Sequence, residues 1–517
     1  MKRFNKIFPN TYFALIAISM LFVMTGCKRF LDTDRQGVYS PEDYPYPGGS
    51  GPYDQFVFAA YNELRNFNVH SQSFITASSI RSDDADKGST PADGGANAID
   101  MDNFPVTPSN GFCNTLWIGY YALINKCNVT IKEVNTNTQI IGTPAVKNQT
   151  IAEAKFMRAY AYFNLVRFFG RVPKIDTLFE NPTAQNNIPQ STAAQMYTFI
   201  ESDLTFAAAN LPLSWDPATF PGRLTSGAAN GLLAKVYLTQ QKWAQAMAAA
   251  NTVIMSNQYN LTTSYDILFR EEGENSKESV FEVQATASAN AQTANGVQYA
   301  QIQGVRGSGV WDLGWGWNTP STYLEAAYEL NDPRKLRTIL YTSTAVVPGP
   351  TIYGEITPTG LPNPRYNNKV YTNPALRASI GNRFGYWMNI RVLRYADVVL
   401  MYAEAANEVG GVANIDAARV ALNSVRARAR VGAPAGTLPD VVTVDQALLR
   451  DAIRKERRVE LAMEHDRFFD LVRWGIAGTV MNASGKPNFD NNRDVLLPIP
   501  QTQIDLSQGV LTKNPGY

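Results

Sequence analysis

Apolar residues recur at spacings of three and four along much of this chain, which is the pattern of amphipathic helices. Thr443, with Gln446 three residues later, has the spacing of a capping box and predicts that the last helix begins there. The periodic segments predict a mainly α-helical protein and cover residues 53–67, 114–134, 151–169, 193–210, 228–256, 395–408, 416–429 and 444–474.

In two of these regions, three small residues are separated by the same intervals: the second follows the first by 12 positions, and the third follows the second by 4. A small residue at each point allows two antiparallel helices to pack closely across a short turn. A third, looser helix pair is formed by 153–173 and 193–212. Repetition of this kind predicts tetratricopeptide-like helix pairs. The matching positions are Ala234, Ala246 and Ala250 in one region and Ala405, Ala417 and Ala421 in the other.

Long stretches rich in glycine, proline and asparagine separate the helical segments, chiefly 81–112, 286–322 and 341–390. Loops of this length are uncommon inside a compact protein and are usually functional. We therefore expect a tetratricopeptide-like helical scaffold packed with a loop-rich, irregular subdomain.

The N-terminus has the pattern of a bacterial lipoprotein signal. Lys2, Arg3 and Lys6 give a basic start, and 12–24 are almost entirely apolar, about 20 Å as a helix against a hydrocarbon core of about 30 Å. That length suits a signal peptide over 1–26 rather than a membrane anchor. Thr25, Gly26 and Cys27 then form a lipobox, which predicts acyl chains such as palmitate on Cys27. The alternative is an ordinary secretory signal followed by a chance cysteine.

Composition narrows the function. The 517 residues are 45% hydrophobic and 18% charged with a net charge of +1, which describes a globular chain. No basic stripe with interleaved aromatics points to nucleic acid. Cys113 and Cys127 lie about 21 Å apart on one expected helix, too far for a disulfide. HExxH, CxxC and GxSxG motifs do not occur, so neither a catalytic nucleophile nor a metal site is expected.

Several strings, taken together and in order, resemble the SusD/RagB family of outer-membrane nutrient-binding lipoproteins. The likeness runs from Cys27 to Tyr517, with an N-terminal part of about 27–240 and a C-terminal part of about 241–517. One departure is EHDR at 464–467, where the family commonly has glycine after the glutamate; we expect it on a helix surface. The strings are EAKFMRAYAYFNLVRFFGRVP, AANGLLAKVYLTQQKWAQA, NDPRKLRTI, RYADVVLMYAEAANE, LNSVRARA, IRKERRVELAMEHDRFFDLVRWG and LLPIP…LTKNPGY.

The resemblance implies a lipid-anchored protein of the outer membrane that faces the cell exterior, and it implies that the loop-rich subdomain beside the helical scaffold binds the ligand. It also implies capture of an oligosaccharide or polysaccharide and delivery to a SusC-like TonB-dependent transporter, without catalysis. Two alternatives stay open. One is a surface scaffold that binds peptides through its tetratricopeptide-like helices, and the other is a glycoside hydrolase, which needs two carboxylates about 5 to 9 Å apart.

The segment GSGVWDLGWGWNTPS at 307–321 places Trp311, Trp315 and Trp317 within seven residues, with glycines between them. Flat indoles stack on the C–H faces of sugar rings, so these tryptophans are candidate carbohydrate-binding residues. The alternative is that they pin the loop onto the helical scaffold, because buried aromatic side chains are common structural anchors.

A second candidate is the acidic turn in SSIRSDDADKGSTPADGG at 78–95. Asp83 and Asp84, with Asp86 close by, offer oxygens that could accept hydrogen bonds from sugar hydroxyls. The same oxygens suit Ca²⁺, but the spacing lacks the distal glutamate of a calcium loop. A solvated acidic turn is the third reading, and we expect no bound cofactor.

The remaining charge clusters read as scaffold. Arg454, Glu456, Arg457 and Glu460 stand three and four residues apart, which predicts ion pairs within and between helices. Arg394 and Asp397 in RYAD are expected to tie helices together in the same way.

Overall fold

The computed structural model describes residues 51–179, 181–342 and 350–517. Cys27 and the expected signal segment 1–26 lie outside the described residues. Within the described ranges, no helix combines the length and the apolar character that crossing a membrane requires.

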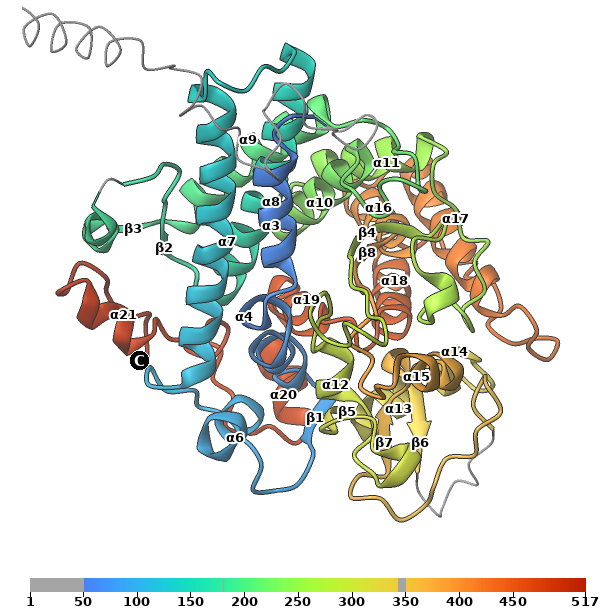
Figure 1. Ribbon diagram of the computed structural model, residues 1–517. Coiled ribbons are helices and arrows are strands. Elements are labelled where there is room, and N and C mark those ends of the chain that lie inside the picture. The colour runs from blue at the N-terminus through green and yellow to red at the C-terminus, as the bar shows by residue number, and fades with distance from the viewer. Residues whose placement is uncertain (1–50, 180, 343–349) are drawn as a thin grey trace, which may run out of the picture. The chain divides into compact units, whose positions relative to one another are not determined.

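Helices dominate, and the longest pack against one another in sequence (Figure 1). Each of α7 to α11 contacts the next, α11 contacts α16, and α16 contacts both α17 and α18. This arrangement confirms the mainly helical, tetratricopeptide-like scaffold. The bounds are α7 Gly111–Thr136, α8 Pro144–Phe169, α9 Ala193–Asn210, α10 Ser226–Thr239, α11 Trp243–Met255, α16 Tyr395–Val409, α17 Val412–Ala429 and α18 Gln446–Glu460.

The small residues of the repeat lie largely where the helices meet. Ala234 on α10 and Ala246 and Ala250 on α11 are fully buried. In the second pair Ala405 is fully buried, whereas Ala417 and Ala421 are partly exposed. The fully buried alanine near these positions is Ala418, so the contact face of α17 is shifted by one residue from the expected one.

Helix α8 is the centre of the core. From Thr150 to Phe169 nearly every side chain is buried, because α7, α9 and α3 (Asp54–Leu64) cover it. A helix that is covered on all sides needs no polar face, which explains its run of aromatic and alanine residues. Thr143 caps its start by accepting a hydrogen bond from the Val146 amide, and Pro144 occupies the first turn.

The last long helix differs from expectation. The prediction of one helix over 444–474 is wrong: α18 ends at Glu460, and α19 (Arg467–Arg473) begins after a turn. The capping-box prediction is also wrong, because Asp445 caps α18 by accepting hydrogen bonds from the amides of Ala447 and Leu448. An aspartate beside the threonine is the stronger acceptor at this helix start.

The turn between α18 and α19 contains the EHDR departure, which does not lie on a helix surface. His465 is 5% exposed and has a φ of +74°. This left-handed backbone is the conformation that glycine adopts most easily, and histidine is among the residues that tolerate it. Its ring instead bonds the Tyr299 hydroxyl, with Nε2 and the oxygen 2.7 Å apart.

Cys113 and Cys127 both lie on α7, buried and unpaired, as their spacing predicts. Burial raises the pKa of the Cys113 thiol to about 12, and that of Cys127 also rises for the same reason. Both thiols are therefore inert core residues.

The strands of the described residues form four two-stranded antiparallel sheets, β1 with β5, β2 with β3, β4 with β8 and β6 with β7. The sheets β1–β5 and β6–β7 lie at the lower right of Figure 1, whereas β2–β3 lies on the left and β4–β8 lies higher, beside α16. The strands are β1 Ala85–Gly88, β2 Val172–Pro173, β3 Gln190–Ser191, β4 Ser279–Val283, β5 Trp317–Pro320, β6 Ile339–Tyr341, β7 Arg365–Asn367 and β8 Ile390–Arg394. The shorter helices are α4 Phe67–His70, α5 Gln72–Ile75, α6 Gly95–Asn103, α12 Tyr299–Gln303, α13 Thr322–Ala327, α14 Arg334–Thr338, α15 Pro374–Ile380, α20 Ala477–Ala483 and α21 Gln501–Leu506.

Buried ion pairs join these parts, but between elements rather than along one helix. Glu460 on α18 meets Arg394, Arg428 and Arg334 at 3.0, 2.6 and 3.1 Å. Arg457 meets Asp397 of α16 at 2.5 Å. The charges of IRKERRVEL are therefore inter-element ties, and removing one partner would leave a buried charge uncompensated.

Candidate functional site

The two segments that the sequence singles out are hydrogen-bonded to each other. Strand β1 comes from the acidic segment and β5 from the tryptophan-rich segment, and they pair antiparallel. Asp86 lies opposite Thr319, and Gly88 lies opposite Trp317. Just beyond the strand, the Ser89 amide donates to the Gly316 carbonyl at 2.6 Å. Residues more than 200 positions apart thus form one ribbon.

A groove of about 330 Å³ runs along this ribbon. Its volume falls in the range of roughly 300–1,000 Å³ that is typical of small-molecule sites. A third loop segment, 362–365, forms the opposite wall. The groove is lined by Asp86, Lys87, Gly88, Ser89, Pro91, Asp102, Thr319, Pro320, Pro362, Asn363, Pro364 and Arg365.

Hydrogen bonds hold the walls together before any ligand arrives. The Asn363 amide donates to the Ser89 carbonyl at 3.1 Å, and Arg365 Nε donates to the Pro320 carbonyl at 2.9 Å. Lys87 Nζ donates to the Thr90 carbonyl at 2.7 Å. A site whose walls are fixed in this way loses little conformational entropy on binding.

Asp86 is the most exposed polar side chain among the described residues that line the groove. Successive side chains of a strand point to opposite faces, so Ala85 and Lys87 are buried while Asp86 is exposed. Within the described residues its carboxylate makes no ion pair and accepts no hydrogen bond. Ionised, it can accept hydrogen bonds from two hydroxyl groups of a sugar.

Asp102, the other carboxylate of the groove, is already engaged. It accepts a hydrogen bond from the Lys87 amide at 2.9 Å and forms an ion pair with Lys486. These contacts fix α6 against β1 and make Asp102 a structural group of the wall.

Two of the three candidate tryptophans are buried. Trp311 is 8% exposed and stacks on Tyr371, with ring centroids 5.9 Å apart. Trp317 is 4% exposed, and Lys87 Nζ lies 5.2 Å from its ring centroid. Their contacts are those of loop anchors, with little ring surface left for a sugar.

Trp315 is partly exposed and packs against the main core with one part of its ring. Its amide donates to the Gln301 carbonyl at 2.8 Å, which fixes the backbone. Of the described residues that line the β1–β5 groove, none is a tryptophan. Trp315 is therefore the member of the three best placed to contact a ligand beyond the groove.

Asp83 and Asp84 are 2% and 1% exposed and face arginines from the C-terminal part. Arg467 Nε donates to Asp83 at 2.8 Å, and Arg458 reaches both carboxylates at 2.7–2.8 Å. Burial alone raises the pKa of Asp83, but hydrogen bonds and charge from the arginines hold it below its usual value. Burial, with the neighbouring Asp83 charge, raises the pKa of Asp84.

No metal site accompanies these carboxylates in the part of the chain that the structure describes. There, no three or more His, Cys, Asp or Glu side chains come together in a way that could hold an ion.

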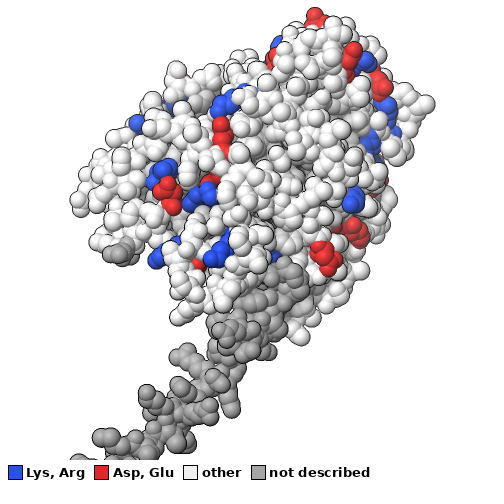
Figure 2. Space-filling model, turned by 90° about the horizontal axis from the view of Figure 1, so that it is seen from above, with Lys and Arg blue, Asp and Glu red and all other residues white. Residues whose placement is uncertain are grey.

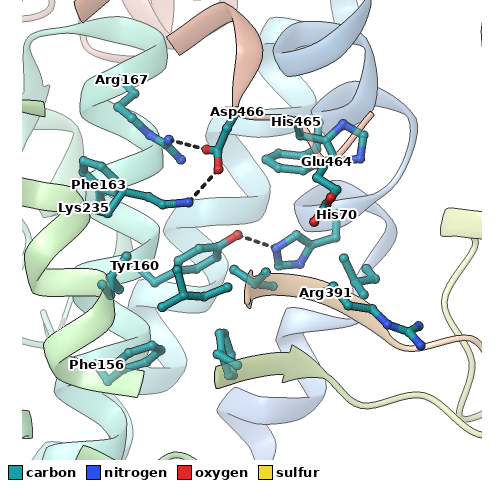
Figure 3. A pocket seen from close by; sticks show the side chains of 16 residues that line it. His70, Phe156, Tyr160, Phe163, Arg167, Lys235, Arg391, Glu464, His465 and Asp466 are labelled. Atoms are coloured by element: carbon teal, nitrogen blue, oxygen red, sulfur yellow. Dashed lines mark hydrogen bonds and ion pairs between the residues drawn. The ribbon is translucent and has the colours of Figure 1, made fainter. Parts of the chain in front are cut away.

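Both histidines of the chain line one small interior cavity of about 40 Å³ (Figure 3). The Tyr160 hydroxyl points at His70 Nε2 from 2.6 Å, and Lys235 and Arg167 both point at Asp466. Burial lowers the pKa of His70 to about 4 and that of His465 to about 3, so both rings are uncharged at neutral pH. The cavity is large enough for water but not for a sugar.

The surface face in Figure 2 carries lysine and arginine side chains interspersed with aspartate and glutamate. Neither sign of charge dominates this face, in keeping with the net charge of +1. A face on which both signs are mixed does not steer a polyanion or polycation toward it.

Comparison with known proteins identifies the family of this chain. A family model described as "SusD family" matches residues 277–517, and one described as "Starch-binding associating with outer membrane" matches 56–238. A solved laminarin-binding SusD-like protein is 30% identical, with a TM-score of 0.72, over 90% of this chain and 99% of its own. The chain therefore belongs to the SusD family.

Other relatives agree over nearly the whole length. "SusD-like protein P2" of Formosa agariphila is 27% identical over 97% of this chain and 98% of its own. Surface glycan-binding protein A from Bacteroides fluxus is 25% identical over 90% of this chain and 99% of its own, with a TM-score of 0.73. The part boundaries near residue 240 stay a prediction.

Sequence reasoning did not find the third wall of the groove. Asn363 and Arg365 lie in a segment that was recognisable only as a long loop. The one local signal is that Asn363 stands between Pro362 and Pro364, which favours a fixed, extended backbone.

Proposed function

We propose that this protein captures oligosaccharide in the β1–β5 groove at the cell surface and passes it to a SusC-like TonB-dependent transporter. A lipid on Cys27 would hold it on the outer membrane. The observation that carries the proposal is the preformed polar groove, with the exposed carboxylate of Asp86, which has no partner among the described residues. The 30% identical laminarin-binding relative supports glycan as the ligand class.

The groove is suited to binding rather than to hydrolysis. A glycosidase needs one carboxylate as acid and another as base or nucleophile. Of the two carboxylates lining the groove, Asp102 is held by Lys486 and the Lys87 amide, which leaves Asp86 without a partner for such chemistry. The carboxylate, hydroxyl and amide groups instead suit hydrogen bonding to sugar hydroxyls.

Native gels cast with a panel of neutral and anionic polysaccharides test the ligand class, because a glycan binder is retarded in the gel that contains its ligand. Retardation by at least one glycan, with the sugar recovered uncleaved, is expected. Release of shorter products would favour the hydrolase. Binding of peptides without retardation by any glycan would favour the peptide-binding scaffold.

The transporter step has a separate test. Extraction of cross-linked outer membranes in mild detergent should recover a large TonB-dependent transporter with this protein. A Cys27→Ala variant should lose palmitate labelling and leave the membrane fraction. Recovery of the protein without any such transporter would count against the delivery role.

A further inference from the structure

A second groove of about 490 Å³ lies on α7 and shares no residue with the β1–β5 groove. Helix α7 forms its floor, the segment after β2 forms one wall, and α21 with the residues that follow it forms the other (Figure 1). Its volume also lies in the range of roughly 300–1,000 Å³ of small-molecule sites. We call it the α7 groove.

The lining of the α7 groove is neutral. Its described side chains are apolar, aromatic, hydroxyl or amide, and among the described lining residues there is no Asp, Glu, Lys, Arg or His. An anionic or cationic ligand would lose its hydration there without gaining a counter-charge. The lining comprises Trp117, Ile118, Tyr121, Ala122, Asn125, Pro173, Ile175, Thr177, Leu178, Phe179, Gln185, Asn186, Gln503, Ser507 and Leu511.

Aromatic rings and amides stand together in this lining. Tyr121 and Phe179 are each partly exposed, and Tyr121 leans on the buried Trp117 with ring centroids 5.2 Å apart. In the described part of the chain, the side-chain amides of Asn125, Gln185 and Asn186 make no hydrogen bond to protein, although each lines the groove. Exposed rings with uncommitted amides match the C–H faces and hydroxyl edges of a sugar.

The groove is fixed without a ligand. The Tyr121 hydroxyl donates to the Pro173 carbonyl at 2.8 Å, and the Asn128 amide donates to the Ile175 carbonyl at 3.0 Å. On the opposite wall Gln503 Nε2 donates to Asn114 Oδ1 of α7 at 2.8 Å. These bonds hold both walls against the helix, so binding does not have to order them.

We infer that the α7 groove is a second carbohydrate site, which takes a short stretch of a neutral glycan on Tyr121 and Phe179. Its amides bond the sugar hydroxyls. The inference rests on the proposed function for the class of ligand, and on the neutral lining for the absence of charge. Two sites on one protein let a single glycan chain, or two chains, be held at once and raise the avidity for a polymer.

Hydrogen–deuterium exchange of the full-length protein in detergent tests this inference, because it reports each groove separately. The probes are neutral hexasaccharides of glucose with different linkages, an anionic oligogalacturonate, and a neutral peptide mixture. Protection of 173–179 and 185–188 by a neutral hexasaccharide, and not by the oligogalacturonate, is the expected result.

The possible patterns separate the two proposals. Protection confined to the β1–β5 groove overturns the α7 site and leaves the proposed function standing. Protection confined to the α7 groove supports this inference and overturns the placement of the first site. Protection of the α7 groove by peptide but no sugar overturns the ligand class, and protection of neither groove overturns both proposals.

Paired variants assign the effect to the groove. Asn125→Ala on the exposed surface of α7 should weaken glycan-induced protection of 173–179 about 3- to 10-fold in sugar concentration, the scale of one lost hydrogen bond. Lys126→Ala is the matched control, since Lys126 is the next residue, is exposed and lies outside the groove. Equal behaviour of the two variants would overturn the role of the Asn125 amide and with it this assignment.

Discussion

Gly88 on β1 lies directly opposite Trp317 on β5. Gly88 has a φ of +69°, and a Cβ added there would stand 2.4 Å from the Gly316 carbonyl oxygen. The close approach of the two backbones therefore depends on a glycine at this point. This close approach joins the acidic segment to the tryptophan-rich segment along one side of the groove.

Replacing Gly88 with alanine should open the ribbon. The positive φ alone costs about 1–2 kcal/mol for alanine, and the clash with Gly316 adds about 1–3 kcal/mol. Gly95→Ala is the matched control, because Gly95 has a φ of +56° but no atom within 4 Å of an added Cβ. The free energy of unfolding, measured with denaturant, and the glycan affinity should both fall more for Gly88→Ala than for Gly95→Ala. Equal losses in the two variants would show that the close approach is unimportant.

Replacing the buried tryptophans should affect stability, and replacing the partly exposed one should affect glycan binding. Trp311→Ala and Trp317→Ala remove buried rings and should cost about 3–5 kcal/mol of unfolding free energy. Trp315→Ala should lower the unfolding free energy less than these two variants, because the ring is only partly buried, and should weaken glycan binding by about 5- to 150-fold, the scale of 1–3 kcal/mol for one large apolar contact. Melting temperature and affinity measured on the same samples separate the effects. A large melting shift with unchanged affinity for Trp315→Ala would remove it from the site.

A variant of Asp83 tests whether this residue stabilises the fold or contacts the ligand. Asp83→Asn leaves Arg467 and Arg458 without part of their counter-charge in a buried setting, which should lower the unfolding free energy by about 3 kcal/mol. Asp416→Asn is the control, because its ion pair with Arg419 is exposed and should be worth less than about 1 kcal/mol. A loss of glycan affinity in folded Asp83→Asn, with little loss of stability, would instead place Asp83 in contact with the ligand.

The two buried histidines predict a pH dependence of stability. Burial holds the pKa of His70 at about 4 and of His465 at about 3, against about 6.5 when unfolded. The unfolded chain therefore takes up the proton first, and stability present above pH 6.5 is lost as the pH falls toward 4 and then 3. Each ring should contribute a loss of about 2 kcal/mol between pH 7 and 5.

Urea unfolding at pH 7, 6 and 5 measures this slope. His70→Gln and His465→Gln should each flatten it, whatever their effect on stability at pH 7. A slope unchanged in both variants would mean that other groups set the pH dependence in this range.

The helical scaffold could be predicted because its signals are local. Periodic apolar residues placed the helices, and small residues such as Ala234 and Ala246 placed their contacts. The end of the helix at Glu460 could not be predicted from the sequence, because Met463 and His465 adopt positive φ angles that their residue types do not predict. Tertiary contacts, such as the bond from His465 to Tyr299, decide those angles.

The groove could be predicted only in part. The acidic and tryptophan-rich segments both attract attention in the sequence, but their pairing joins residues more than 200 positions apart. Burial is set by that pairing, so composition could not tell that Asp83 faces arginines while Asp86 faces solvent. Arg458 and Arg467, the partners of Asp83, lie in the C-terminal part and give no local sign of the contact.

The most direct test of glycan capture is a calorimetric titration of the protein with the glycan that the gels identify. Asp86→Asn removes the exposed carboxylate charge of the groove, and Asp451→Asn removes an exposed charge on α18 outside it. We expect both variants to keep the stability of the wild type. Asp86→Asn alone should bind the glycan about tenfold or more weakly, the scale of hydrogen bonds to a charged group. The sugar should be recovered uncleaved. Equal affinity in the wild type and Asp86→Asn would contradict the assignment of the groove, and no heat with any glycan would contradict glycan capture itself.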